Sequence, residues 1–281
     1  MIIDTSTRIY DPNNGLISPK DFYEHPPIPQ KLYKYFSFPN SKTERNKRLR
    51  QLRMGNLWLS TMELLNDPLD MMMLNTDSLS ANEKKYYYES LNNKCCLSLT
   101  SGATNTLMWA HYAQAFSGYC VGFKRADNAN IKPINYNKGL LDLIEEYKAF
   151  YSMVNSPERK KLFSSMALLI DDPNTALKIK KLTDELLYTK TKEWKYEKEY
   201  RIVLPLKDES EGCKGGLYNV TELNLNISEI TMGLRISEEN KTLLMQSCDI
   251  INQKRKNSDL VKLYQLEVRG CKLVKCPANH K

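Results

Sequence analysis

The chain has 281 residues and a formal charge of +8, so it is long enough to bury one large core and it favours anionic partners, with nucleic acid the commonest. Seven cysteines without a Cys-x-x-Cys pair, and only three histidines, predict reduced thiols and give no readable zinc site. The first residues lack a signal-peptide pattern and no apolar run is long enough to span a bilayer, which predicts a cytoplasmic protein without membrane contact.

Residues 1–31 are predicted to form an irregular arm. Several prolines and the segment Asp11–Gly15 interrupt this region, and such residues disfavour regular strand pairing. The first strand is expected at Lys31–Phe38. Tyr33 and Tyr35 should point to the same side of it, because side chains alternate along a strand.

A basic helix is expected next. Ser41 is a suitable N-cap, Glu44 completes a capping box, and Gly55 suits the C-terminal stop. Six of the twelve residues Lys42–Arg53 are basic. The cluster is either a solvated helix face or a surface that contacts phosphates, and the pattern leaves both open. Its candidate substrate-binding residues are Arg48, Arg50 and Arg53.

Two strands and a helix are predicted before residue 101. Asn56–Ser60 and Lys94–Thr100 have strand character, and a capping box at Ser80 predicts a helix to about Leu91. Asp67 precedes a proline, where an acidic residue commonly closes a turn on its own backbone. Asp67 is therefore either a turn residue or a candidate substrate-binding residue.

Asn105–Phe116 is predicted to be a helix, with Thr104 as its cap and Gly118 at its end. Trp109 belongs to an aromatic stripe on this helix, and such a stripe is typical of a core face. His111 lies on the neighbouring face. A histidine in this setting is more often a hydrogen-bonded core residue than a catalyst, although it stays a candidate.

The chain beyond residue 118 is expected to alternate between strands and a helical insert. Gly122 in the strand Tyr119–Lys124 indicates a bulge or a close backbone approach. Apolar residues recur at helical spacing over about 139–190, which predicts the helical insert. A strand is expected over 194–206, with Leu217–Leu223 pairing back onto it as a hairpin.

Glu197 and Glu199 lie in Thr191–Val203, where aromatic and charged residues alternate with the period of a strand. The two carboxylates should therefore stand side by side on one face. A charged face of a strand is usually solvated. The other interpretation is a cleft wall, where paired carboxylates hold different protonation states and do acid–base or electrostatic work.

The C-terminal part is predicted to hold strands at Ile227–Gly233 and Leu260–Val268, a helix from Ser237 to Cys248, and a basic tail over 269–281. We therefore expect a single α+β domain over residues 32–268 with a mixed β-sheet core.

Five sequence blocks stand in one order along the chain. They are Tyr33-Lys34-Tyr35, Leu57-Trp58-Leu59-Ser60, Asn66-Asp67-Pro68-Leu69-Asp70, Leu107-Met108-Trp109-Ala110-His111-Tyr112 with Gly118-Tyr119-Cys120, and Lys192-x-Trp194-x-Tyr196-Glu197-x-Glu199-Tyr200-Arg201. This ordered set resembles the uncharacterised bacterial family called domain of unknown function 2971, from about residue 32 to 268.

A second resemblance is to the ADP-ribosyltransferase fold. Those enzymes run through a basic or aromatic residue on an early strand, a Ser-Thr-Ser-like strand and a Glu-x-Glu. The counterparts here are Lys34 or Tyr35, then Ser98, then Glu197 and Glu199, although no arginine lies on the first strand. The resemblance implies that NAD is a substrate, that Glu199 stabilises an oxocarbenium-like transition state, and that Glu197 orients or deprotonates the acceptor.

Further site candidates complete this hypothesis. His111 is a candidate catalytic residue, Trp109, Tyr112 and Arg201 are candidate cofactor-binding residues beside Lys34, Tyr35 and Ser98, and Lys192 is a candidate substrate-binding residue. No metal ligands are predicted for this enzyme.

Three functions are compatible with the sequence. The leading hypothesis is a transferase that attaches ADP-ribose from NAD to a macromolecule, plausibly DNA or RNA, and acts as a toxin or phage-defence effector restrained by a partner protein. The second is a nuclease in which Asp67, Glu197 and Glu199 gather Mg²⁺ and Lys192 steadies a phosphate. The third is a non-catalytic module that binds nucleic acid or protein.

Overall fold

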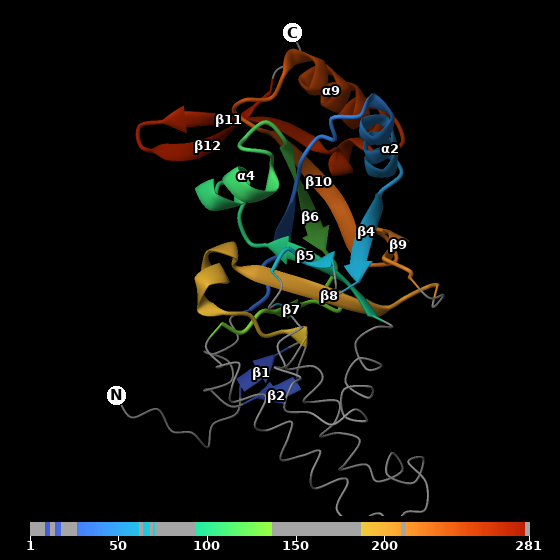
Figure 1. Cartoon of the computed structure of the whole chain (residues 1–281), viewed down its shortest axis with the longest axis vertical. Helices are drawn as coiled ribbons and strands as arrows, with labels where there is room; N and C mark the ends of the chain where they lie inside the picture. Colours follow the sequence, from blue (N-terminus) through green and yellow to red (C-terminus); the bar gives the residue numbers. More distant parts are fainter. Residues whose placement is uncertain are drawn as a thin grey trace, which may run out of the picture.

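A mixed sheet of ten strands forms the centre of the described part of the chain in this computed structural model (Figure 1). The structure describes residues 9–11, 15–17, 27–61, 64–67, 70, 94–136, 187–208 and 212–278. The strands of the main sheet are β3 (Lys31–Phe36), β4 (Asn56–Thr61), β5 (Lys94–Thr100), β6 (Tyr119–Arg125), β7 (Lys132–Pro133), β8 (Glu199–Pro205), β9 (Gly215–Asn219), β10 (Leu225–Met232), β11 (Lys262–Arg269) and β12 (Lys272–Pro277).

The strand order is β12-β11-β10-β6-β3-β5-β4-β9, with β8 pairing to β5 and β7. The pair β10–β11 is parallel, whereas β6 pairs antiparallel with both β3 and β10. Few helices accompany this sheet in the part of the chain that the structure describes. The mixed sheet confirms the α+β class predicted from the sequence.

The sheet splits along one edge of β5. On the other edge, β5 pairs with β8 over its whole length, from Lys94 to Thr100. On the split edge, β4 pairs only with Cys95 and Cys96, and β3 pairs only with Thr100. Among the described residues, the backbone around Ser98 therefore has no strand neighbour on that side, and the gap between β3 and β4 opens into the cavity described below.

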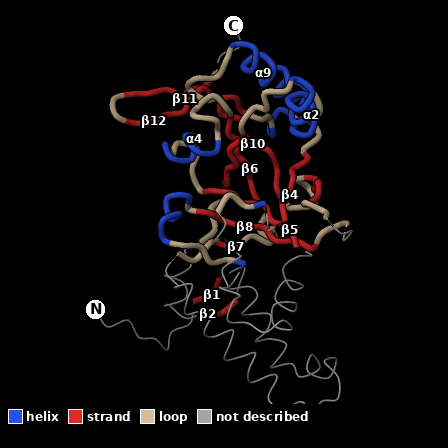
Figure 2. Tube along the Cα trace, viewed as in Figure 1, coloured by secondary structure: helices blue, strands red, loops and turns tan. Residues whose placement is uncertain are grey.

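Helices α2 (Lys42–Arg53) and α9 (Glu238–Asn252) lie together over one face of the sheet (Figure 2). Leu49 and Leu244 are buried there in one hydrophobic cluster with Leu32 of β3. The side chain of Ser41 accepts a hydrogen bond from the backbone N–H of Glu44, as predicted for the helix start.

Helix α4 (Thr106–Tyr112) packs against the opposite side of β3, where Tyr33 and Tyr35 point. Trp109 is fully buried, its ring meets Tyr35 edge-on at 5.2 Å, and its indole N–H donates to the Ala103 carbonyl at 2.8 Å. The predicted core face is confirmed, but its cap is Asn105 rather than Thr104.

The end of α4 differs from the sequence-based prediction. The helix stops at Tyr112, well before Gly118, because Gln114, Ala115 and Phe116 all have left-handed backbone angles. Gly118 has another role. A Cβ there would lie 2.1 Å from the carbonyl oxygen of Phe36, so only glycine permits this close approach.

Gly122 lies opposite Glu229 of β10, where the register shifts between Ile227 and Glu229. A Cβ on Gly122 would lie 2.5 Å from Cγ of Glu229 and 2.9 Å from Cε1 of Tyr33. The expected bulge is therefore confirmed as an irregularity of the partner strand β10, whereas the close approach to this glycine is made by side chains and not by backbone.

Three expectations about the ends and pairings of the chain are corrected. The N-terminal arm contains a short antiparallel pair, β1 (Ile9–Asp11) with β2 (Gly15–Ile17), although this region was expected to be irregular. The basic tail contains β12, which pairs with β11. Residues 215–219 pair with β4 instead of forming a hairpin with β8.

The predicted helix over 80–91 lies outside the described residues, as does the helical insert over 139–190 for all but its last few residues. None of the helices in the described part of the chain combines the length and the apolar character needed to cross a membrane.

Candidate functional site

The predicted strand over 194–206 is wrong in its first part. Residues Lys192–Glu197 form the 3-10 helix η3, and β8 begins only at Glu199. Thr100 Oγ1 donates to the carbonyl of Glu197, and Asn105 Nδ2 donates to the carbonyl of Tyr196, both at 2.6 Å. These tertiary hydrogen bonds hold η3 in place, and local alternation does not encode them.

The turn between the two glutamates places them in one buried site. Lys198 adopts a left-handed backbone angle, φ 47°, and so redirects the chain between η3 and β8. Glu197 and Glu199 are each only 4% exposed. The interpretation of this segment as a solvated face is therefore wrong.

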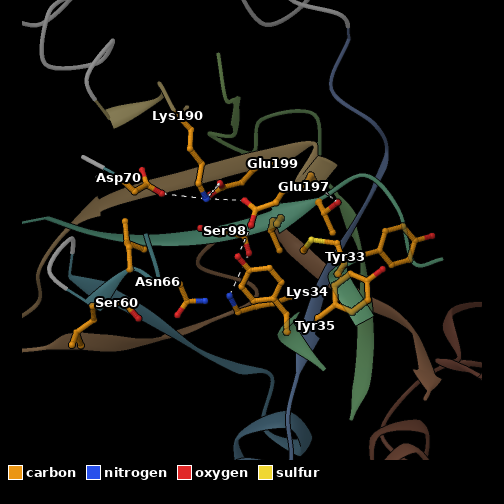
Figure 3. Close-up of a pocket in the computed structure, with 16 residues that line it drawn as sticks. Tyr33, Lys34, Tyr35, Ser60, Asn66, Asp70, Ser98, Lys190, Glu197 and Glu199 are labelled. Atoms are coloured by element: carbon orange, nitrogen blue, oxygen red, sulfur yellow. Dashed lines mark hydrogen bonds and ion pairs between the residues drawn. The ribbon is translucent and has the colours of Figure 1, made fainter. Parts of the chain in front are cut away.

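Lys190 joins three carboxylates (Figure 3). Its Nζ atom lies 2.7 Å from Glu197 Oε2, 3.2 Å from Glu199 Oε2 and 3.3 Å from Asp70 Oδ2. The ammonium donates hydrogen bonds to Glu197 and Glu199 and forms an ion pair with Asp70. Lys190 is itself buried, and its Nζ also lies 4.9 Å from the centre of the Trp194 ring.

Arg201 contacts the same carboxylate cluster without lining the cavity. It is fully buried and donates to Glu199 from Nε at 2.6 Å, to the Leu187 carbonyl from one terminal nitrogen at 3.0 Å, and to Asp70 and Glu199 from the other. Glu199 is thus held by two cations. Within the described residues, Glu197 contacts one cation, Lys190, and accepts a hydrogen bond from the hydroxyl of Tyr112.

These unequal partners separate the protonation behaviour of the two glutamates. Burial raises the pKa of Glu197, and the single contact with Lys190 does not reverse that effect. Burial would also raise the pKa of Glu199, but Arg201 and Lys190 lower it to about 2. Two neighbouring carboxyls with pKa values pushed in opposite directions are suited to divide acid–base work from charge stabilisation.

A cavity of about 230 Å³ opens on this cluster at the split of the sheet. Its polar lining comes from Lys34, Asn66, Asp70, Ser98, Lys190, Glu197 and Glu199, and its aromatic lining from Tyr33, Tyr35 and Tyr112. Figure 3 shows the labelled side chains converging from segments that are distant in sequence, among them the strands β3, β5 and β8. The cavity therefore combines charged groups with aromatic faces, as ligand sites commonly do.

Lys34 lies across the cavity from the carboxylates. Its Nζ donates to the carbonyl of Ser98 at 3.3 Å. Ser98 lies in the part of β5 that, among the described residues, has no strand partner on the edge facing β3 and β4. Burial lowers the pKa of Lys34, although Cys96 and Glu199 oppose this effect. Its ammonium makes no ion pair within the described residues, and an anionic ligand group would satisfy it.

Asp70 also has free binding capacity. Its Oδ2 contacts Lys190 and Arg201, but its buried Oδ1 has no hydrogen-bond partner among the residues described. Burial raises the pKa of Asp70 against the influence of Arg201. A buried acceptor without a partner is costly, and a hydroxyl of a bound ligand would satisfy it.

Several predicted site residues lie outside the cavity lining. Arg201 contacts Glu199, and Trp109 packs against Tyr35 in the core, but neither side chain lines the cavity. Asp67 is buried but does not join the carboxylate cluster. Lys192 is exposed on η3, and His111 is exposed at the end of α4 rather than in the core, because the helix turns it toward solvent.

The basic helix does not reach the cavity either. Arg48 donates to the carbonyl of Ser37 at 2.6 Å, and Arg53 lies 3.4 Å from Ser247 Oγ on α9. Arg50 is exposed. Arg48 and Arg53 therefore join α2 to neighbouring segments, whereas Arg50 faces solvent. Neither a fully solvated face nor a phosphate-contacting surface describes the whole basic cluster.

Sequence reasoning missed Lys190 and Asp70. Lys190 lies at the end of a stretch predicted to be helical, and Asp70 stands in the quoted block after Pro68 without an assigned role. The sequence gives no direct signal for either residue, because lysines and arginines outnumber carboxylates between Lys190 and Arg201 and Asp70 lies far from both glutamates along the chain.

Lys190 already occupies the point where the three carboxylates converge. Within the described part of the chain, no group of three or more His, Cys, Asp and Glu side chains is arranged to hold a metal ion. All seven cysteines are free.

Fold and site define an α+β protein whose split mixed sheet holds a polar cavity above a buried cluster of three carboxylates and two cations. Residues 108–202 match the model of a protein family of unknown function, DUF2971. The predicted resemblance to this family is thereby confirmed for residues 108–202, whereas its expected extent over 32–268 stays a prediction. The matched segment includes most of α4, the first part of β8 and both glutamates. No curated protein and no solved structure matches the chain.

Proposed function

We propose that this protein is an ADP-ribosyltransferase-like enzyme that uses NAD as its substrate. The observation that carries the proposal is the convergence of Lys34, Ser98 and Glu199 on one cavity from β3, β5 and β8, of which β5 pairs with both of the others. These residues stand in the chain order that the resemblance to ADP-ribosyltransferases implies, and the ADP-ribosyltransferase-like arrangement of the sheet is part of the same proposal.

Glu199 is suited to stabilise positive charge. When the bond from ribose C1 to nicotinamide breaks, its electron pair leaves with nicotinamide and the ribose becomes oxocarbenium-like. A carboxylate whose pKa is held near 2 by Arg201 and Lys190 stays ionised at neutral pH and offers a fixed negative charge to that centre.

Glu197 is suited to handle the proton of the acceptor. A new bond forms between an acceptor oxygen or nitrogen and ribose C1, and the proton released from the acceptor passes to the carboxylate of Glu197. A raised pKa brings this carboxyl closer to neutral pH, which suits a general base. Tyr112 and Lys190 hold its two oxygens and so orient the group.

The remaining cavity residues fit the other parts of NAD. The ammonium of Lys34 offers a contact for a phosphate, the rings of Tyr33, Tyr35 and Tyr112 offer faces for an aromatic ring, and Asp70 Oδ1 can accept from a ribose hydroxyl.

A metal-dependent nuclease fits this geometry less well. That function needs Asp67, Glu197 and Glu199 to share a divalent cation, but Asp67 is not part of the cluster. The shared position among the carboxylates belongs to the ammonium of Lys190, which supplies the charge that a metal would supply.

The test is release of nicotinamide and transfer of label from labelled NAD, with cell extract or nucleic acid as acceptor, in the presence of a chelator. Glu199→Gln should lower the rate about 100- to 1000-fold while leaving the fold intact, because it deletes a charge that stabilises the transition state. Glu193→Gln is the matched control, since Glu193 is exposed on η3 and does not line the cavity. Equal rates in the two variants would contradict the proposal.

We further propose a role as a toxin or antiviral effector that modifies nucleic acid and is held in check by a partner protein. The charge of +8 supports an anionic target. Induced expression of the wild-type protein should arrest growth, and Glu199→Gln should relieve the arrest at equal protein level.

A further inference from the structure

A row of aromatic rings runs along the outside of the site. Trp194 and Tyr196 lie on η3 with ring centres 6.0 Å apart, and His111 of α4 lies 6.1 Å from Tyr196. The contact between η3 and α4 is fixed by the hydrogen bond from Asn105 to the Tyr196 carbonyl. Trp194 and Tyr196 are half-buried and His111 is exposed, so the row is reachable from solvent.

A line of lysines accompanies the rings. A 3-10 helix has about three residues per turn, so residues three apart lie above one another. Lys192 and Lys195 therefore share one edge of η3, and Lys198 follows at its end. All three are exposed, and within the described residues none of their ammonium groups has a hydrogen bond or an ion pair within 4 Å. Glu193 is the exposed acidic residue on the same helix.

The basic helix α2 is a poorer candidate for an anionic polymer. Arg45 is paired with Glu239 at 2.7 Å and with Asn240 at 3.1 Å, and Arg48 is held by Ser37. Arg45 and Arg48 are already used inside the protein. Lys42 and Arg50 of α2 are exposed, but no ring contact among the described residues involves this helix, whereas the three lysines of η3 lie beside Trp194 and Tyr196 in sequence. Rings and free cations therefore occur together at η3 and not at α2.

The row also leads to the cavity. Tyr112 follows His111 in α4, lines the cavity and donates a hydrogen bond to Glu197, which is the last residue of η3. A ligand lying along Trp194, Tyr196 and His111 thus ends beside the carboxylate that handles the acceptor proton in the proposed function.

We propose that His111, Tyr196 and Trp194, with Lys192, Lys195 and Lys198, form a binding surface for single-stranded nucleic acid. Unpaired bases stack on aromatic faces without sequence preference, and lysines contact the phosphates between them. A duplex does not expose its base faces and so gains only the charge contacts. That the bound strand is the acceptor of ADP-ribose rests on the proposed function, whereas the binding itself does not.

The experiment measures binding of a fluorescein-labelled single strand of about twelve nucleotides, as DNA and as RNA, by anisotropy without NAD. The variant Lys192→Ser with Lys195→Ser should lower the slope of log K against log salt by about 1.4, because each phosphate that a lysine neutralises on a single strand contributes about 0.7 to that slope. Adding His111→Ala should weaken binding at one salt concentration by about a further tenfold.

The matched control is Lys254→Ser with Lys256→Ser, which removes the same charge from exposed positions after α9. The control should keep the wild-type affinity apart from a small change common to any loss of net charge. A second readout is Trp194 fluorescence in a Trp58→Phe background, where stacking of a base should quench the emission. Trp109 is fully buried and serves as the constant signal.

Three results would overturn the proposal. They are equal weakening by the control pair, a duplex bound as tightly as the single strand, and absence of binding by either strand. Because the assay contains no NAD, loss of binding and loss of NAD chemistry are separate outcomes, and neither can be mistaken for the other.

Discussion

Replacing Lys190 with Met tests whether the three buried carboxylates are ionised and stabilised by the Lys190 ammonium. The change keeps a long, flexible side chain but leaves Asp70 and Glu199 with Arg201 alone and removes the cation that contacts Glu197. Removing one partner from a buried ion pair typically costs about 3–5 kcal/mol, because the remaining charge is desolvated without compensation. At about 2–4 °C per kcal/mol for a chain of this size, the melting temperature should fall by roughly 6–20 °C at neutral pH.

The loss should depend on pH with a definite sign. Glu197 would lose its contact with a cation, so its pKa in the folded state would rise further above the unfolded value. A carboxyl whose folded pKa is raised contributes stability below the unfolded pKa and loses it as pH rises through the folded pKa. The gap between Lys190→Met and wild type should therefore be small in acid and widen toward neutral pH.

The assay is thermal unfolding followed by circular dichroism across this pH range. Lys195→Met is the control for a lysine of the same segment, since Lys195 is exposed and its loss should cost less than about 0.5 kcal/mol. Lys190→Arg keeps the charge and should recover part of the stability. If Lys190→Met had the same melting temperature as Lys195→Met at every pH, Lys190 would not stabilise the carboxylate cluster.

Four further outcomes are expected. Trp109→Ala should lose about 3–5 kcal/mol of stability by chemical unfolding, because the indole is fully buried, and a wild-type midpoint would show that it is not. Gly122→Ala should cost about 1–3 kcal/mol in the same assay, since its Cβ would lie 2.5 Å from Glu229. Glu197→Gln should keep nicotinamide release but lose transfer to an acceptor, as measured by separating free from attached ADP-ribose; equal loss of both would remove its role as base. Arg48→Glu should lower the melting temperature, whereas Arg50→Glu should leave it unchanged, because only Arg48 is bound by Ser37.

Local signals in the sequence were sufficient for much of the sheet and for the start of helix α2. The strand Lys94–Thr100 has the bounds that its composition predicts, and Tyr33 and Tyr35 share the face that alternation assigns to them. The cap at Ser41 also follows from its own neighbourhood. Such features depend on residues a few positions apart, which is why composition and spacing reveal them.

Only part of the candidate site could be predicted from local sequence patterns. Alternation brought Glu197 and Glu199 to attention, but it predicted a strand through both and favoured a solvated face. The left-handed turn at Lys198 and the hydrogen bonds from Thr100 and Asn105 make η3 instead. These contacts come from other parts of the chain, and no local period records them.

The sequence by itself determined most of the sheet-forming segments, the aromatic core of α4 and the presence of two close glutamates. Only the tertiary structure decided that these glutamates are buried, that Lys190 and Arg201 neutralise them, and that Asp70 completes the cluster from 131 positions before Arg201. The physical reason is that the ionisation of a carboxylate depends on its burial and on the charges within a few ångströms of it. Both are properties of the folded chain, and neighbours in sequence do not define them.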